Sequence, residues 1–258
     1  MNVDIEDIKG VVVEAGELAR LYYGKVTQSL KADLSIVTEA DKAIEDFLKL
    51  ALAGLAPGYG YMGEETDETR PPAPGEDHLW VVDALDGSRA FSSRLPLWTP
   101  AVCLLKGSRP VAGAAYNPLT DELFWCDVDG PAWCNDSELH PDYAPEFKAN
   151  TIILGPTNQH RTFRTQFPGR IYCLGAPIYQ MCLLAKGSAR AFFFDPAINL
   201  WDLALPAALL ERTGAVMVYA SGRPLDLAEL MDRRLIPEPL FAGGAQMVAE
   251  LRQRIVAA

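Results

Sequence analysis

Acidic side chains at four places along the chain have the types and spacing that could bind divalent metal ions. Asp83 and Asp86 flank Ala84-Leu85, directly before Gly87-Ser88, where an apolar run ends. Carboxylates three residues apart at the end of a buried strand can point at one spot, and hard divalent cations prefer such oxygen ligands. Bound cations would then allow chemistry on an anionic substrate. Taken alone, this segment favours an ordinary Asp-Gly turn, in which both residue types occur for backbone reasons.

Three further acidic segments give weak local signals. Glu64-Glu65 follows a short apolar run and has the character of a solvated loop. Thr38-Glu39-Ala40-Asp41 matches a capping box, which places Asp41 in the first turn of a helix. Asp202 follows Trp201 at the start of another helix, where the helix dipole already favours an acid. Each segment alone has an ordinary structural explanation, whereas their joint order is much more specific.

Composition limits the class of protein. The chain has 258 residues, of which 49% are hydrophobic and 22% charged, and this excludes a disordered or collagen-like chain. A net charge of -11 argues against nucleic acid or an anionic membrane as a partner. We find no signal peptide and no uncharged apolar run long enough to span a membrane. We therefore expect a cytoplasmic protein.

Cysteine and histidine usage argues against a zinc site. The number of cysteines is odd and none are spaced as CxxC, which fits buried free thiols in a reducing compartment; they are Cys103, Cys126, Cys134, Cys173 and Cys182. The three histidines lie far apart in sequence, so we assign none of them a ligand role; they are His78, His140 and His160.

Hydrophobic periodicity predicts mixed helices and strands in two halves. Before the polar segment 135–149 we expect helices over 4–23 and 38–54, a loop over 66–78, and strands over 79–83, 99–105, 110–116 and 122–126. After it we expect strands over 150–154, 170–173, 190–194 and 214–219, and helices over 176–186, 200–213 and 244–256. This pattern predicts a layered α/β (α+β) architecture with domains 1–145 and 146–258.

The ordered acidic motifs resemble those of the inositol monophosphatase superfamily, whose members carry D…GEE…DPxDGT…WDxA in the same order. The likeness covers nearly the whole chain. It includes Lys31-Ala32-Asp33 with Val37–Asp41, Tyr116-Asn117-Pro118 with Asp121–Phe124, Leu174-Gly175-Ala176, and Gly222–Asp226. The resemblance implies an alternating αβαβα sandwich of the inositol monophosphatase and fructose-1,6-bisphosphatase type.

The resemblance also implies two or three Mg²⁺ ions per subunit. One ion would be held by Glu64, Asp83 and the carbonyl oxygen of Leu85. A second would be held by Asp83, Asp86 and Asp202. Glu65 would bind a third ion or lie just outside the inner ligands. Most of these ligands belong to the half 1–145, while Asp202 and the substrate contacts belong to 146–258.

The implied reaction is the hydrolysis of a phosphate monoester. Asp41 with the Ser88 hydroxyl would orient and deprotonate the attacking water, while the N–H groups of Gly87 and Ser88 would hold the phosphate. The metal ions would neutralise the phosphate oxygens and the leaving group. The resemblance further implies lithium sensitivity and a homodimer.

The chain departs from the family pattern near this segment. Ala84 replaces the usual proline, and Ser88 replaces threonine while keeping a hydroxyl. Arg89-Ala90 stands where inositol monophosphatases commonly have Thr-Asn, and a basic residue there is more usual in the histidinol-phosphate and 3′-phosphoadenosine branches. These departures concern the substrate more than the reaction.

Four residues are candidates for substrate contacts, namely Arg89, Gly175, Ala176 and Asp195. Asp195 precedes Asp202 by seven residues, where an inositol-type enzyme has an acid that binds a substrate hydroxyl, although an Asp-Pro turn explains it equally well. We favour a small polyol substrate such as myo-inositol monophosphate. The alternatives are a histidinol-phosphate or 3′-phosphoadenosine-type phosphatase, and a catalytically degenerate binding protein. The complete set of carboxylates argues against the last.

Overall fold

The computed structural model describes residues 3–27, 29–30, 36–66 and 69–258. The segment Lys31-Ala32-Asp33, which contributed to the family resemblance, lies outside the described residues. Within the described ranges, no helix is both long enough and apolar enough to cross a membrane.

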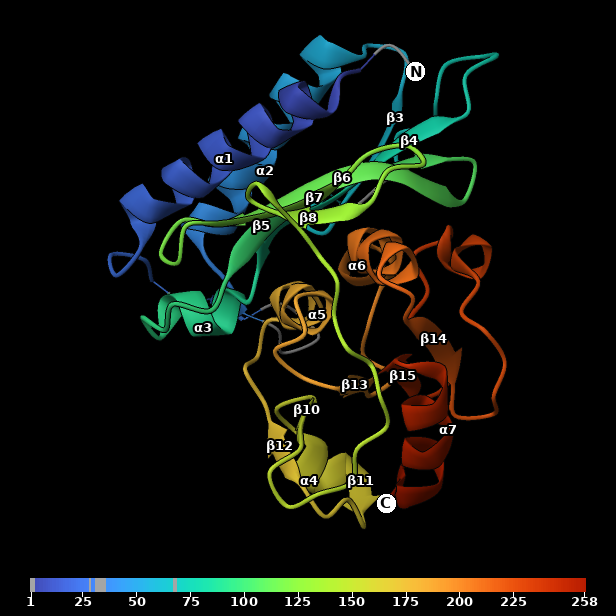
Figure 1. Cartoon of the computed structure of the whole chain (residues 1–258). Coiled ribbons are helices and arrows are strands. Elements are labelled where there is room, and N and C mark those ends of the chain that lie inside the picture. Colours follow the sequence, from blue (N-terminus) through green and yellow to red (C-terminus); the bar gives the residue numbers. More distant parts are fainter. Residues whose placement is uncertain (1–2, 28, 31–35, 67–68) are drawn as a thin grey trace.

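The first part of the chain forms a large sheet with two long helices on one face (Figure 1). The helices are α1 (Ile5–Tyr22) and α2 (Glu39–Leu55). In spatial order the strands are β3 (Gly60–Gly63), β4 (His78–Asp86), β5 (Thr99–Lys106), β6 (Arg109–Asn117), β7 (Glu122–Cys126), β8 (Ala132–Cys134) and β9 (Ser137–Glu138). β3 runs parallel to β4, and the following neighbours are antiparallel. A short strand pair, β1 (Ser29–Leu30) and β2 (Ile36–Val37), precedes α2, and the short helix α3 (Ser88–Ser92) follows β4.

The second part of the chain forms a smaller mixed sheet. In spatial order its strands are β12 (Arg170–Tyr172), β10 (Ile152–Leu154), β13 (Ala191–Phe194), β15 (Leu240–Gly243) and β14 (Val216–Tyr219). The helices of this part are α4 (Gln159–Thr162), α5 (Pro177–Ala185), α6 (Leu200–Arg212), the 3₁₀ turn η1 (Leu227–Leu230) and α7 (Ala245–Arg254). A separate antiparallel pair joins β11 (Phe163–Thr165) to β16 (Ile255–Ala257).

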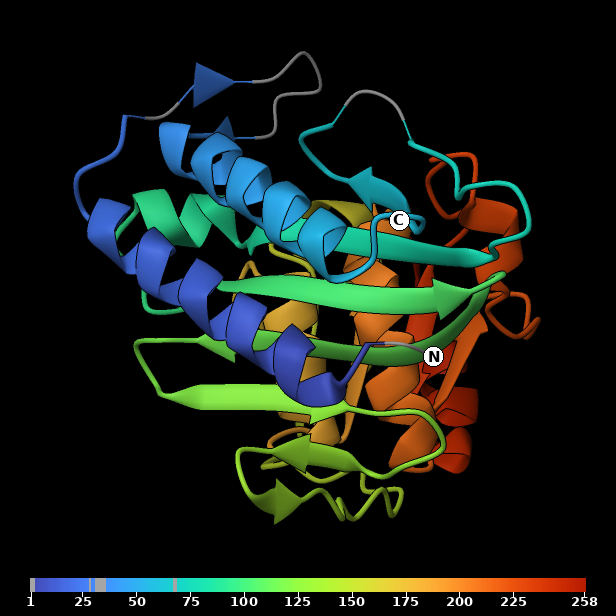
Figure 2. The same cartoon turned by 90° about the horizontal axis from the view of Figure 1, so that it is seen from above.

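The elements stack in five layers, with α1 and α2 outside the large sheet, α5 and α6 between the sheets, and α7 beyond the small sheet (Figure 1). Figure 2 shows α1 and α2 crossing the large sheet side by side. Because side chains alternate across a strand, Trp80 of β4 packs toward α1 and α2, while Val81 joins the core around α5 and α6. Phe192 and Phe193 of β13 divide in the same way between the inner core and the α7 side. The expected αβαβα sandwich is confirmed.

Strand β15 is the main element that the sequence analysis missed. It lies between β13 and β14 in the small sheet and is buried along its whole length. Its buried run Leu240-Phe241-Ala242-Gly243 is a recognisable but short signal. The helix predicted over 244–256 is α7, which ends at Arg254, because the residues after it belong to β16.

The predicted division near residue 145 separates the strands of the two sheets. Segment 135–149 contains the short strand β9 and is otherwise irregular. The inner core nevertheless combines side chains from both parts, including Met62 and Tyr179. The assignment of two domains stays a prediction.

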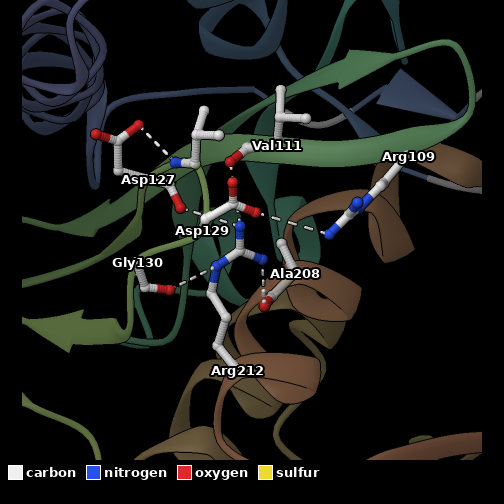
Figure 3. Close-up of polar contacts among 8 residues, drawn as sticks. Arg109, Val111, Asp127, Asp129, Gly130, Ala208 and Arg212 are labelled. Atoms are coloured by element: carbon white, nitrogen blue, oxygen red, sulfur yellow. Dashed lines mark hydrogen bonds and ion pairs between the residues drawn. The ribbon is translucent and has the colours of Figure 1, made fainter.

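Arg212, in the last turn of α6, fastens this helix to the large sheet (Figure 3). Its guanidinium donates hydrogen bonds to the carbonyl oxygens of Val111 (3.2 Å), Asp127 (3.0 Å) and Gly130 (3.1 Å). One side chain thereby links α6 to β6 and to the β7–β8 turn. The contact holds α6, which carries Asp202 in its first turn, against the sheet that carries the other acids.

The expected free thiols are confirmed. Four cysteines are buried, Cys173 is half-buried, and all five are unbridged. His78 is also satisfied structurally, because its ring stacks on Tyr59 with centroids 4.6 Å apart and contacts Glu76. Among the described residues, the group of carboxylates Asp83, Asp86 and Asp202 includes no cysteine or histidine.

Candidate active site

An irregularity in β4 places Asp83 and Asp86 on the same side of the sheet. Asp83 pairs with Ala101 of β5 and Asp86 with Thr99, so three steps on β4 match two on β5. In a regular strand, residues three apart point to opposite faces, whereas one extra residue reverses this relation. Both carboxylates are thus buried and converge, which the sequence spacing predicted without supplying the bulge.

Glu64 and Asp202 meet this pair from two other elements. Glu64 follows β3, and its N–H donates to the carbonyl of Val82 (3.2 Å), directly before Asp83. Asp202 lies in the first turn of α6, where it accepts the N–H of Asn199 at 2.9 Å. Carboxylate oxygens of Asp83, Asp86 and Asp202 lie within 4.8 Å of one another. The structure therefore brings together the acids that the sequence places far apart.

Burial raises the pKa of both Asp83 and Asp86 well above the ordinary value, and the neighbouring carboxylates of Glu64 and Asp202 add to the effect. Such a cluster is costly to ionise unless a cation compensates its charge. An oxygen-only donor set of this kind fits a hard divalent ion such as Mg²⁺. The residues present therefore fit the implied metal.

Asp41 and Ser88 form a hydrogen-bonded pair beside the acid cluster. The Ser88 hydroxyl donates to Asp41 Oδ1 (2.7 Å) and also lies 3.0 Å from the carbonyl oxygen of Leu85. The other oxygen of Asp41 accepts the N–H (2.7 Å) and the hydroxyl (2.6 Å) of Thr38, as the capping box predicts. The carboxylate is buried and held at both oxygens, so its orientation is fixed.

Gly87 lies between Asp86 of the acid cluster and Ser88 of the hydrogen-bonded pair, at a position that has no room for a side chain. Its φ of 86° is in the left-handed region, and a Cβ would lie 2.6 Å from the carbonyl oxygen of Leu97 and 2.9 Å from the Cβ of Ala176. The N–H of Tyr179, in the first turn of α5, donates to Asp86 at 2.8 Å. The N-termini of α3 and α5 thus both lie at the acid cluster.

The predicted substrate contacts lie on an adjoining pocket of about 560 Å³. Arg89, Gly175 and Asp195 line it, whereas Ala176 is buried behind it. Asp195 accepts a hydrogen bond from the side chain of Asn158 at 2.5 Å. Asn158, His160 and Arg161 also line the pocket, and the sequence analysis gave these residues no role. Without a motif of their own, they could be found only through the pocket.

A family model described as "Inositol monophosphatase family" matches residues 3–255. The chain belongs to the inositol monophosphatase family. The "Inositol-1-monophosphatase" of Mesorhizobium japonicum is 29% identical over 228 residues, which cover 81% of this chain and 83% of that protein.

Solved structures support the inositol monophosphatase fold. The extragenic suppressor protein suhB from Bartonella henselae matches with a TM-score of 0.81 at 22% identity, covering 96% of each chain. An "IMPase/NADP phosphatase complexed with Mg2+ and phosphate" matches with a TM-score of 0.77 at 17% identity, covering 93% of this chain and 90% of that one.

Glu45 is a buried acid to which the sequence analysis gave no role in this member of the inositol monophosphatase family. It lies one turn after Asp41 on α2 and accepts the N–H of Glu65 at 2.7 Å and the hydroxyl of Thr66. A side chain on Gly63 would collide with its carboxylate. Burial is the main cause that raises its pKa. Glu45 thus supports the loop that presents Glu64.

Arg233 is a second residue without a sequence signal, and it joins two segments that carry acids. Its Nη2 donates to the carbonyl of Gly63 at 3.0 Å, next to Glu64. Its guanidinium also lies 4.9 Å from the centre of the Trp201 ring, next to Asp202. One side chain therefore contacts the neighbours of two predicted metal ligands.

We expect Arg233→Met to weaken Mg²⁺ binding roughly tenfold to a hundredfold, the range seen when a group that orients metal ligands is removed. The reason is that the Glu64 and Asp202 segments lose their shared contact. Calorimetric titration with Mg²⁺ measures the affinity directly. Arg234→Met is the matched control, because Arg234 is exposed and pairs with Asp232. Equal Mg²⁺ affinity in both variants would remove Arg233 from this role.

Proposed function

We propose that this member of the inositol monophosphatase family hydrolyses the phosphate monoester of a small polyol, with myo-inositol monophosphate as the reference substrate. The observation that carries the proposal is the meeting of Asp83, Asp86 and Asp202 beside the hydrogen-bonded pair Asp41–Ser88. The similarity to the inositol-1-monophosphatase of Mesorhizobium japonicum supports the substrate class.

The donor set suggests how metal ions would be held. Glu64, Asp83 and the Leu85 carbonyl would hold one Mg²⁺, and Asp83, Asp86 and Asp202 a second, with Glu65 near a third. Mg²⁺ in such a site supplies electrostatic stabilisation of the phosphoryl oxygens and the leaving group. The Mg²⁺ and phosphate named for the related IMPase/NADP phosphatase support this assignment.

The residues of the chain perform the remaining steps. The N–H groups of Gly87 and Ser88 would hold the phosphate, which fixes the phosphorus atom near the acids. Asp41, oriented by Thr38 and Ser88, would accept the proton of the attacking water. The hydroxyl groups of the polyol would meet Asp195 and Asn158 in the adjoining pocket.

We expect phosphatase activity on myo-inositol monophosphate to vanish in excess chelator and to return with Mg²⁺ but not with Ca²⁺. Ca²⁺ forms longer and less regular bonds, so it misplaces the reacting groups. Phosphate release measured with each ion tests this, and a restored melting temperature with Ca²⁺ shows that the ion has bound. Full activity in excess chelator would overturn the metal assignment.

Two other functions make different predictions. A histidinol-phosphate or 3′-phosphoadenosine-type phosphatase would prefer those compounds to a polyol phosphate, and Arg89 is the residue that favours this alternative. A degenerate binding protein would release no phosphate from any ester, including an aryl phosphate, at millimolar Mg²⁺. The carboxylates of Asp83, Asp86 and Asp202 lie close enough together to hold a metal ion, which argues against a catalytically degenerate protein.

The proposal includes a cytoplasmic homodimer that Li⁺ inhibits, as the family resemblance implies. Sedimentation analysis tests the dimer. Titration of the Mg²⁺-dependent activity with LiCl, with KCl as the ionic-strength control, tests the inhibition.

A further inference from the structure

The pocket beside the acid cluster carries a surplus of positive charge. Arg89 lines it from α3 and Arg161 from α4, whereas Asp195 is its acidic lining residue. The whole chain has a net charge of -11, so the sign of the charge in this pocket is opposite to that of the whole protein. A cationic cavity in an acidic protein selects anionic groups of a ligand.

The two guanidinium groups of this pocket are available to a ligand. Arg89 and Arg161 are exposed, and their side chains form no hydrogen bond or ion pair with a described residue. Some other exposed arginines are engaged, for example Arg223 with Glu229 and Arg234 with Asp232. An unpaired guanidinium offers a fork of donors that matches a carboxylate or a phosphate.

Asn158 and Asp195 give the pocket groups that suit hydroxyls. The Nδ2 of Asn158 donates to Asp195 Oδ2 at 2.5 Å, so part of that acid is already engaged. The Oδ1 of Asn158 is buried and has no hydrogen-bond partner within the described part of the chain. A buried amide oxygen without a donor is costly, and a ligand hydroxyl would satisfy it.

The pocket is continuous with the place expected for the scissile phosphate. Gly175 and Pro177 line it and flank Ala176, whose Cβ is the atom that would collide with a side chain on Gly87. Arg89 directly follows Ser88 on α3. The pocket therefore lies next to Gly87 and Ser88, whose N–H groups are proposed to hold the phosphate.

We propose that the preferred substrate carries a second anionic group, a phosphate or a carboxylate, which Arg89 and Arg161 bind while its hydroxyls contact Asn158 and Asp195. This inference rests on the proposed function and narrows it from polyol monophosphates to phosphorylated polyols with a further anion.

The test compares kcat/KM with Mg²⁺ for five esters, namely myo-inositol monophosphate, an inositol bisphosphate, a phosphorylated aldonic acid, histidinol phosphate and an aryl phosphate. We expect one or both doubly anionic compounds to exceed myo-inositol monophosphate on the order of 10- to 100-fold, the range of a hydrogen bond to a charged group. The bisphosphate and the aldonic acid distinguish a second phosphate from a carboxylate.

Variants connect the preference to the pocket. Arg161→Ala should bring the ratio of kcat/KM between the doubly anionic ester and myo-inositol monophosphate close to one, and Arg161→Lys should restore part of it. Arg164→Ala is the matched control, because Arg164 is exposed on β11 and does not line the pocket. It should keep the full ratio.

Binding gives a readout that is independent of turnover. Calorimetry on the Ca²⁺-loaded protein should show tighter binding of the doubly anionic ester than of myo-inositol monophosphate, and Arg161→Ala should remove the difference. Equal binding of both esters, an unchanged ratio in Arg161→Ala, or a preference for histidinol phosphate would overturn the inference. Hydrolysis of none of the five esters would overturn the proposed function instead, and the calorimetric comparison would still decide the inference.

Discussion

Asp86→Asn should reduce the turnover of the Mg²⁺-loaded protein by roughly 10³-fold or more, which is the scale of losing a charged group that stabilises the reacting centre. Asn keeps the size of the side chain and an oxygen that can accept the N–H of Tyr179, so the first turn of α5 stays capped. It removes one charge from a cluster that includes Asp83 and Asp202. Phosphate release and the melting temperature, measured with and without Mg²⁺, give both effects.

The same substitution should change how the stability of the metal-free protein depends on pH. Burial is the main cause that raises the pKa of Asp86 above the ordinary 3.8, so the folded state binds its proton more tightly than the unfolded state does. The contribution of this carboxyl group to the stability of the metal-free protein is therefore present at low pH and is lost as the pH rises from about 4 through the raised pKa. In Asp86→Asn this decline should be shallower, and Mg²⁺ should add less stability.

Asp226→Asn is the matched control for this prediction. Asp226 is exposed and accepts the N–H of Ala228 at 2.9 Å, which caps η1. It does not belong to the cluster of Asp83, Asp86 and Asp202. This control should retain wild-type turnover and the wild-type pH dependence. Near wild-type turnover in Asp86→Asn would reduce Asp86 to a residue that caps a helix.

Ser88→Ala should lower kcat by roughly 10²- to 10⁴-fold with little change in KM, because a contact to the proposed general base, Asp41, is lost while the N–H groups proposed to hold the phosphate remain. The Ser88 hydroxyl reaches Asp41 Oδ1 at 2.7 Å and so fixes the oxygen that Thr38 does not hold. Steady-state kinetics on the Mg²⁺-loaded protein separate the two parameters.

A purely structural role for Ser88 predicts a different result. The structure shows no side-chain cap at the start of α3, where Gly87 is the N-cap, so the hydroxyl does not stabilise the helix in that way. Ser88→Thr keeps the hydroxyl and should keep kcat. Ser92→Ala, in the same helix, loses a bond to the Arg89 carbonyl and is the hydroxyl control. A melting-temperature loss in Ser88→Ala without a kcat loss would leave Asp41 to act alone.

Sequence by itself determined the features that depend on neighbours in the chain. The capping box from Thr38 to Asp41 spans three residues, so its hydrogen bonds follow from local geometry and were predicted correctly. The long helices and most strands followed from hydrophobic period, and the order of the acidic motifs identified the family before any contact was known.

Only the tertiary structure decided which of these residues meet. The bulge in β4 depends on pairing with β5, and it turns Asp83 and Asp86 to one side. Ser88 and Asp41 are 47 residues apart, and Asp86 accepts an N–H from a helix 93 residues away. Sheet register and helix packing set such distances, and no local preference of the chain encodes them.

The same limit explains the residues that lacked any sequence signal. Arg233 and Arg161 are single basic residues outside a motif. Arg233, in the turn after η1, contacts Gly63, which lies 170 residues earlier in the chain, and Arg161 of α4 lines a pocket formed by distant segments. Strand β15 was missed because four buried residues are too short to show a period, while the pairing partners on both sides specify the strand. The sequence thus determined the chemistry available to the site, and the fold decided its geometry, because long-range contacts arise only when the layers pack together.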